Sequence, residues 1–136
     1  MKQVAVLVIE DGASEAGMVS AALALRPEVL VVESADAQGA IERLADRDVP
    51  AALAIAGRRA LADSPADLVK DLGERGIPVV GIAAGLSAAA EKVALAAGVR
   101  EIHRRPTTWR PYSELIEAVV ARFIRTDSPP PPDRTS

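Results

Sequence analysis

Five short apolar runs, each followed by a segment of helical pattern, constrain the fold of this chain more than any other sequence feature. The runs are rich in Val, Ile, Leu and Ala and occupy residues 3–9, 28–33, 51–56, 78–83 and 99–104. Apolar character that is nearly continuous, rather than alternating, is typical of strands covered on both faces. Strands separated by helices join into a parallel sheet through right-handed crossovers. The pattern therefore predicts an α/β domain with a doubly wound parallel sheet.

Local signals mark where some of the helices begin and end. Ser64, Pro65 and Asp67 combine a cap residue, a first-turn proline and an early acid, which predicts a helix start near residue 64. This third helix is expected to end before Gly76, and Gly98 is expected to end the fourth.

The chain is long enough for one domain, and its C-terminal end has a different composition. Residues 126–136 include four consecutive prolines and have no means of packing a core, which predicts a disordered tail or linker remnant. The expected organisation is one domain over residues 1–125 followed by this tail.

Composition and charge exclude several classes of function. The sequence is 49% hydrophobic and 26% charged, with a formal net charge of −3, which gives no general attraction to nucleic acids or anionic membranes. It has no cysteine and one histidine, His103, which excludes thiolate catalysis and most transition-metal sites. Within residues 1–12 the apolar run is too short, and the acidic residues Glu10 and Asp11 follow too early, for a signal peptide or a membrane span. A cytoplasmic protein is expected, with neither nucleic acid nor membrane as partner.

The carboxyl ends of the strands are where a doubly wound sheet keeps its ligands and chemistry. The first strand is followed by Glu10 and Asp11, but the third offers only alanine, glycine and arginine. No carboxylate, Ser, Thr, Cys or His occurs from residue 50 to residue 61. The centre of the predicted sheet edge therefore lacks a nucleophile.

Three motifs carry a resemblance to a known family. VLVIEDG (6–12), IPVVGIAAG (77–85) and AAGVREIHRRP (96–106), in this order and at these separations, resemble the receiver domains of bacterial two-component response regulators. The likeness covers roughly residues 3–125. It implies a flavodoxin-like (βα)5 fold with strand order 2-1-3-4-5. In that family an acid pair after the first strand holds Mg²⁺, and an aspartate after the third accepts a phosphoryl group. A Thr or Ser follows the fourth strand and Lys-Pro follows the fifth.

The resemblance assigns positions to the residues of this pocket. Glu10 and Asp11 match the acid pair, and Ala83 stands where the Thr or Ser would be. Arg105 and Pro106 stand in place of Lys-Pro, which implies a cis peptide bond between them.

The acceptor position falls on Ala56 or, with a slip of one residue, on Gly57, and Ile102 stands where a switching aromatic is common. Phosphoryl transfer to a receiver needs a carboxylate nucleophile, which neither residue supplies. We therefore interpret the chain as a degenerate receiver, a pseudo-receiver that is not an enzyme and has no catalytic residue, metal or cofactor.

The remaining charged residues of the pocket allow more than one interpretation. Glu10 and Asp11 could pair with Arg58, Arg59 or Arg105, could hold an ion, or could be solvated. The arginines of the rim, Arg104 included, form either a solvated basic surface or an anion site.

The last helix suggests an interaction surface. Its two apolar stripes cover about half of its circumference, more than a surface helix needs. The second stripe either meets a partner or fills space left by alanine-rich neighbours. Receivers commonly signal through the face made by the fourth helix, fifth strand and last helix. The residues expected to contribute there are Arg100, His103, Arg104, Trp109, Arg110, Tyr112, Ile116 and Val120.

Two functional hypotheses follow. The first is a signalling module that acts by phosphorylation-independent contact with a protein partner, a second copy of the chain being one candidate. The alternative is a sensor that binds a small anion or nucleotide in the vacated, arginine-lined pocket.

Overall fold

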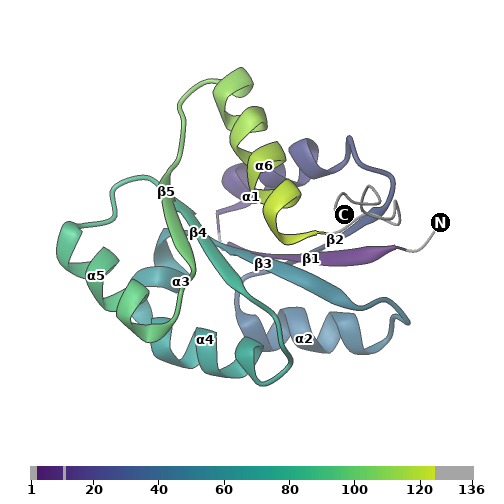
Figure 1. Cartoon of the computed structure of the whole chain (residues 1–136), viewed down its shortest axis with the longest axis horizontal. Coiled ribbons are helices and arrows are strands. Elements are labelled where there is room, and N and C mark those ends of the chain that lie inside the picture. The colour runs from purple at the N-terminus through teal and green to yellow at the C-terminus, as the bar shows by residue number, and fades with distance from the viewer. Residues whose placement is uncertain (1–2, 11, 125–136) are drawn as a thin grey trace, which may run out of the picture.

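A parallel five-stranded sheet forms the centre of the molecule (Figure 1). The computed structural model describes residues 3–10 and 12–124, with the backbone alone described for residues 13–16. The strand order is β2-β1-β3-β4-β5, which confirms the predicted fold class and order. Each strand lies within two residues of its predicted bounds. The strands are β1 (Val4–Ile9), β2 (Val29–Ser34), β3 (Ala51–Ala56), β4 (Val79–Ala83) and β5 (Glu101–Arg104).

Helices cover both faces of the sheet (Figure 1). Two of them, α1 (Ala13–Leu23) and α6 (Trp109–Phe123), pack on one face. The other face carries α2 (Ala37–Ala45), α3 (Arg58–Asp63), α4 (Pro65–Gly73) and α5 (Ala88–Ala97). Side chains of a strand alternate between the two cores, so that Leu7 and Ile9 face α2 while Val6 and Val8 face α1.

The register between β1 and β3 positions the candidate site. Ile9 lies opposite Ala56, and the amide of Gly57 donates a hydrogen bond of 2.9 Å to the carbonyl of Ile9. Both strands therefore end at the same level of the sheet. This brings the residues that follow them, Glu10 and Gly57, side by side.

The segment after β3 differs from the prediction of a single helix. It forms the short helix α3 directly after Gly57 and then the separate helix α4. Pro65 disfavours helical geometry at the residue before it, and Ser64 accordingly has φ −150° and ψ 62°. The predicted start near Ser64 and the end before Gly76 are correct for α4. Gly98 ends α5 with φ 119°, as expected.

Both apolar stripes of α6 face the core. Ile116, Val119 and Val120 are at most 2% exposed, and Leu115 and Phe123 pack against the same cluster. The small side chain of Ala22 on α1 belongs to this cluster. Of the two alternatives for the second stripe, the structure therefore favours the one in which it fills the space beside α1.

Candidate functional site

The carboxyl group of Glu10 lies directly over Gly57 at the carboxyl edge of the sheet. A Cβ atom built on Gly57 would be 1.5 Å from Oε1 of Glu10, far inside van der Waals contact. The other oxygen, Oε2, accepts a hydrogen bond of 3.1 Å from the amide of Gly12. Glu10 is half-buried and Gly57 is buried. The carboxylate thus takes the space in which a side chain at position 57 would begin.

Little room remains around these two residues. Arg105 and Tyr112 close the space above Gly57, and Val8 and Ile55 line it from the sheet. The cavity that they leave is about 10 Å³, which is room for one water molecule at most. One guanidinium nitrogen of Arg105, Nη1, contacts Sδ of Met18 at 3.9 Å. Among the described residues, the space beside Gly57 is therefore largely occupied by the side chains of Glu10 and Arg105.

The structure decides between the two candidate acceptor positions. Ala56 is buried in the core on the α2 side of the sheet, with Ile9 and Leu61. Gly57, one residue later, faces the other way and shares the small cavity with Glu10 and Arg105. Position 57 is the one from which a side chain would enter the pocket.

The other predicted pocket residues are only partly brought together. Ala83 is buried at the end of β4. Arg58 and Arg59 are exposed on α3, where Nε of Arg59 lies 3.4 Å from Oδ2 of Asp63. Arg104 is exposed at the end of β5. Asp11 lies outside the described residues.

The prediction of a cis bond before Pro106 is wrong, because the Arg105–Pro106 bond is trans. The amide of Arg105 donates a 3.1 Å hydrogen bond to the carbonyl of Ala83, which extends the β4–β5 ladder by one residue. The trans form is the intrinsically favoured one by about 0.5–1 kcal/mol before proline. The loop after β5 thus leaves the strand with ordinary geometry.

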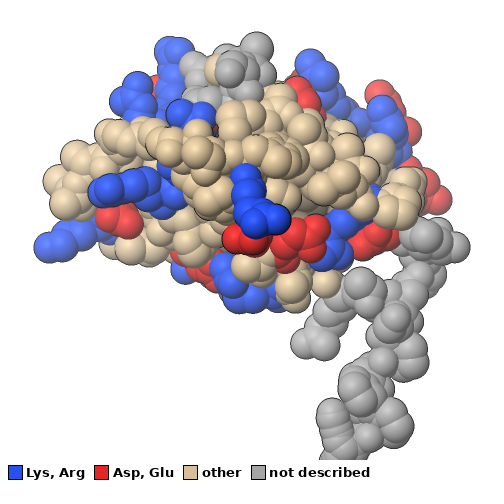
Figure 2. All heavy atoms as spheres, turned by 90° about the horizontal axis from the view of Figure 1, so that it is seen from above, with Lys and Arg blue, Asp and Glu red and all other residues tan. Residues whose placement is uncertain are grey.

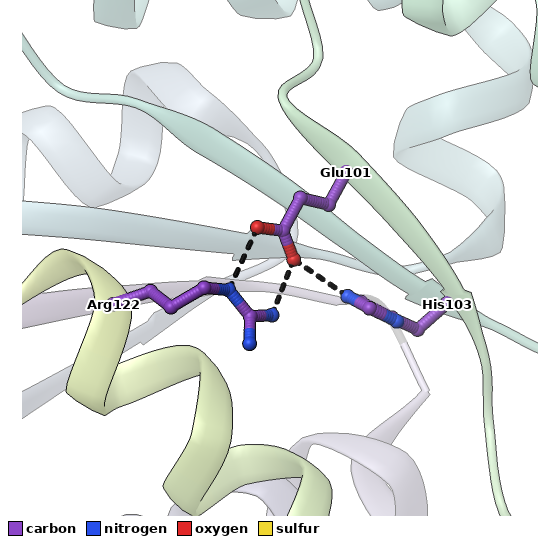
Figure 3. Close-up of polar contacts among 3 residues, drawn as sticks. All are labelled: Glu101, His103 and Arg122. Atoms are coloured by element: carbon purple, nitrogen blue, oxygen red, sulfur yellow. Dashed lines mark hydrogen bonds and ion pairs between the residues drawn. The ribbon is translucent and has the colours of Figure 1, made fainter.

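A polar cluster joins β5 to α6 (Figure 3). Arg122 on α6 binds the carboxylate of Glu101 with two nitrogens, Nε at 2.9 Å and Nη2 at 2.5 Å. On the same side of β5, Nε2 of His103 lies 2.7 Å from Oε1 of Glu101. The hydrogen bonds from Arg122, and to a lesser extent that of His103, lower the pKa of Glu101. The cluster fixes the edge strand β5 to the last helix.

Sequence analysis identified His103 but not its two partners. Glu101 could have been found, because residues two apart on a strand share a face. Arg122 could not, since its contact with β5 depends on how α6 crosses the sheet.

The predicted interaction residues fall into three groups. Arg100, Arg104 and Arg110 are exposed, and Trp109 is 47% exposed. His103 is half-buried in the polar cluster. By contrast, three of the predicted residues are core residues at most 2% exposed, because they lie on the inner side of α6: Tyr112, Ile116 and Val120. These three cannot contact a partner directly, and their assignment to the interface is wrong.

Two exposed apolar residues on α5 were missed by the sequence analysis. Val93 and Leu95 on α5 are 59% and 43% exposed. Their helix is alanine-rich, so its sequence does not show which side would be left uncovered.

Figure 2 shows the molecule from the side of α1 and α6. Lysine and arginine side chains are interspersed with acidic ones around the rim of this face, and uncharged residues form most of its centre. Such mixed charge differs from the single-sign basic surface that nucleic-acid binding requires.

No family model matches the chain, and no curated protein matches it. Solved structures do match over most of its length. The phosphorylated cyanobacterial phytochrome response regulator RcpA has a TM-score of 0.75 at 14% identity, covering 93% of this chain and 97% of that one. The chain has the receiver fold. Response regulator RPA3017 in red light signaling of R. palustris matches with a TM-score of 0.71 at 18% identity, covering 93% of this chain and 98% of that one.

The signal receiver domain of NarL from Mycobacterium tuberculosis is 26% identical, with a TM-score of 0.66 over 90% of this chain and 97% of that one. These neighbours are response regulators or their receiver domains, so the fold is that of a signalling module. Within the described residues, no helix has the length and apolar character needed to cross a membrane.

Proposed function

We propose that this chain is a pseudo-receiver, a signalling module that acts through contact with a protein partner and does not require phosphorylation. The observation that carries the proposal is the position of the Glu10 carboxylate over Gly57. The proposal is also supported by the small volume, about 10 Å³, of the cavity that remains between Glu10, Gly57 and Arg105.

Phosphorylation needs a nucleophile that this pocket does not supply. The group that attacks phosphorus in a receiver is a carboxylate at the end of the third strand, where this chain has Gly57. A phosphoryl group also needs much more space than one water molecule. At the end of β3 the described residues therefore offer neither a carboxylate at the acceptor position nor, in the small cavity beside it, room for a phosphoryl group.

The Mg²⁺ ion that receivers hold fits the described residues poorly. Mg²⁺ requires octahedral oxygen ligands and is usually bound with the help of substrate phosphate. Of the described residues lining the small cavity, Glu10 alone carries a carboxylate, and one of its oxygens already accepts the Gly12 amide. No step of the proposed function passes through a metal ion.

Incubation with acetyl phosphate and Mg²⁺, followed by intact mass spectrometry, tests phosphorylation independence. We expect no phosphoryl adduct on the native protein, whereas a phosphorylatable receiver in the same tube becomes labelled. The Glu10→Ala variant, which opens the space above Gly57, should also remain unlabelled because the nucleophile is still missing. An adduct on the folded wild-type protein would contradict the proposal.

The contact surface that we propose consists of the exposed residues around β5 and the helices beside it. It contains Arg100, Arg104, Trp109 and Arg110, together with Val93 and Leu95 on α5. Aromatic residues and arginine are enriched in protein interfaces. The bond between Glu101 and Arg122 holds the strand and helix of this surface in one arrangement.

Light scattering tests whether a second copy is the partner. We expect a dimer that Trp109→Ala with Val93→Ser dissociates. Leu25→Ser removes an apolar side chain that is 64% exposed after α1, and this control should leave the dimer intact. A dimer insensitive to the double substitution would place the interface elsewhere, and a monomeric wild type would exclude homodimerisation.

The alternative function, an anion or nucleotide sensor in the vacated pocket, is not supported by the small cavity that the described residues form there. The cavity of about 10 Å³ between Glu10, Gly57 and Arg105 leaves no room for a phosphate.

A further inference from the structure

A groove of about 510 Å³ lies beside the sheet, between the N-terminal end of α2 and the corner where α3 meets α4. Its volume is within the range of ligand-binding clefts, about 300–1,000 Å³. It is separate from the small cavity above Gly57 and from the proposed contact surface on β5. Ile9 and Leu68, both buried core residues, line its floor.

The walls of the groove carry an excess of negative charge. Four aspartates, Asp36, Asp63, Asp67 and Asp71, line it together with one basic residue, Arg59. Two of the acids have a partner: Asp36 accepts the amide of Gly39 at 2.7 Å, and Asp63 pairs with Arg59. The side chains of Asp67 and Asp71 form no hydrogen bond or ion pair with any described residue.

The placement of Asp71, four residues after Asp67, costs stability in the free protein. This spacing puts two like charges next to each other on one side of α4. Asp71 also lies in the last turn of a helix that ends at Gly73, where the helix dipole disfavours an acid. A cationic ligand in the groove would remove both penalties. Residues that destabilise their own helix, as Asp71 does by charge repulsion and by its place in the helix dipole, are typical of functional positions.

The chemistry of the lining indicates the kind of ligand. Among the described residues, no three acidic or histidine side chains come close enough to hold a metal ion, so the negative charge is spread along the groove. Nucleic acids and anionic lipid surfaces would be repelled. Lysine and arginine fit this arrangement, because their apolar stems can lie on Ile9 and Leu68 while their charged ends reach the aspartates.

We propose that the groove between α2 and α4 binds a basic segment of a partner protein, with the carboxylates of Asp67 and Asp71 receiving its lysine or arginine side chains. The proposal does not depend on phosphorylation independence or on the β5 surface. It gives the molecule a second, electrostatically distinct contact site.

Fluorescence anisotropy with a labelled Arg-Ala repeat octapeptide tests this proposal. We expect saturable binding that weakens with salt, and no binding of the matching Glu-Ala peptide. Asp67→Asn with Asp71→Asn should weaken binding of the Arg-Ala peptide by about tenfold, or about 1.4 kcal/mol. Asp48→Asn with Glu114→Gln removes the same charge from exposed positions outside the groove lining and should change binding less than about twofold.

A second measurement shows whether the groove variant is folded. Relief of the repulsion on α4 is offset by the loss of a favourable acid in its first turn, so the free energy of unfolding should change by less than about 1 kcal/mol. Absence of saturable binding to the wild type would overturn the proposal. Equal weakening by the groove and control variants would also overturn it, since the attraction would then come from net charge alone.

Discussion

Glu10 and Gly57 show how the loss of one side chain changes its neighbours. A glycine at the end of β3 leaves space for the Glu10 carboxylate, which then faces the backbone of Gly57 instead of a metal or a phosphoryl group. The two residues are thus sterically coupled, and a side chain at position 57 requires Glu10 to move.

Gly57→Ala should lower the free energy of unfolding by about 1–3 kcal/mol, because its Cβ displaces Glu10. In a Glu10→Ala background the same change should cost less, with a coupling energy of about 1 kcal/mol. Urea unfolding of the four proteins measures the cycle. As a control, Gly17→Ala in α1 meets no atom within 4 Å and should stabilise by about 0.5–1 kcal/mol. If the losses of unfolding free energy in the two single variants add up to the loss in the double variant, Glu10 does not fill the space above Gly57.

The pKa of Glu101 makes stability depend on pH. Because Arg122 and His103 hold this pKa below its ordinary value of 4.5, the charged carboxyl is favoured in the folded state. Its contribution to stability is complete above that value and is lost as the pH falls through the lower, folded pKa. Urea midpoints measured from neutral to acidic pH should therefore fall less steeply in Glu101→Gln than in the wild type.

Glu114→Gln provides the matched control for this pH series. Glu114 is exposed on the same helix as Arg122, and its replacement should leave the acid-induced loss of stability as in the wild type. Identical pH profiles for Glu101→Gln and the wild type would refute the role given to the cluster.

At the scale of elements, α6 shows how a helix can combine a structural and a contact role. Its inner side, with Ile116 and Val120, completes the core beside α1, while Trp109 at its start stays half-exposed. The rings of Trp109 and Tyr112 lie 6.4 Å apart, so the exposed aromatic rests against a buried one. The contact role that we propose for α6 therefore involves only its N-terminal end and its outer side.

Ile116→Ala should reduce the free energy of unfolding by about 2–5 kcal/mol, because it opens a cavity in the core. Trp109→Ala should cost about 1 kcal/mol or less, since much of that side chain is already in water. Denaturant unfolding of both variants checks this difference. A small cost for Ile116→Ala would mean that the inner side of α6 is not part of the core.

The α3–α4 segment shows how far local signals extend. The cap at Ser64 and the proline after it predict the start of α4, because both act through the backbone of neighbouring residues. Helix α3 is only six residues long, from Arg58 to Asp63, and carries little periodic signal. It depends on Leu61 packing into the core, a contact that no local pattern reports.

At the scale of the whole molecule, two surfaces differ in the side chains that they expose. The α5–β5–α6 side carries exposed arginines and apolar residues, whereas the groove between α2 and α4 is acidic. The small cavity beside Gly57 is separate from the groove, because the two share no lining residue. The two contact sites that we propose would therefore suit partners of different charge.

The sequence by itself determined the strands, both ends of α4, the C-terminal end of α5 and the missing nucleophile. These follow from hydropathy patterns, caps and residue types, which act over a few neighbouring residues. Only the tertiary structure decided that Gly57 rather than Ala56 enters the pocket, because a shift of one residue along a strand reverses the direction of a side chain. It also decided that Glu10 closes that pocket, that Arg122 reaches Glu101 and that the second stripe of α6 is buried. Each of these depends on contacts between segments far apart in the chain, whose geometry is set by packing.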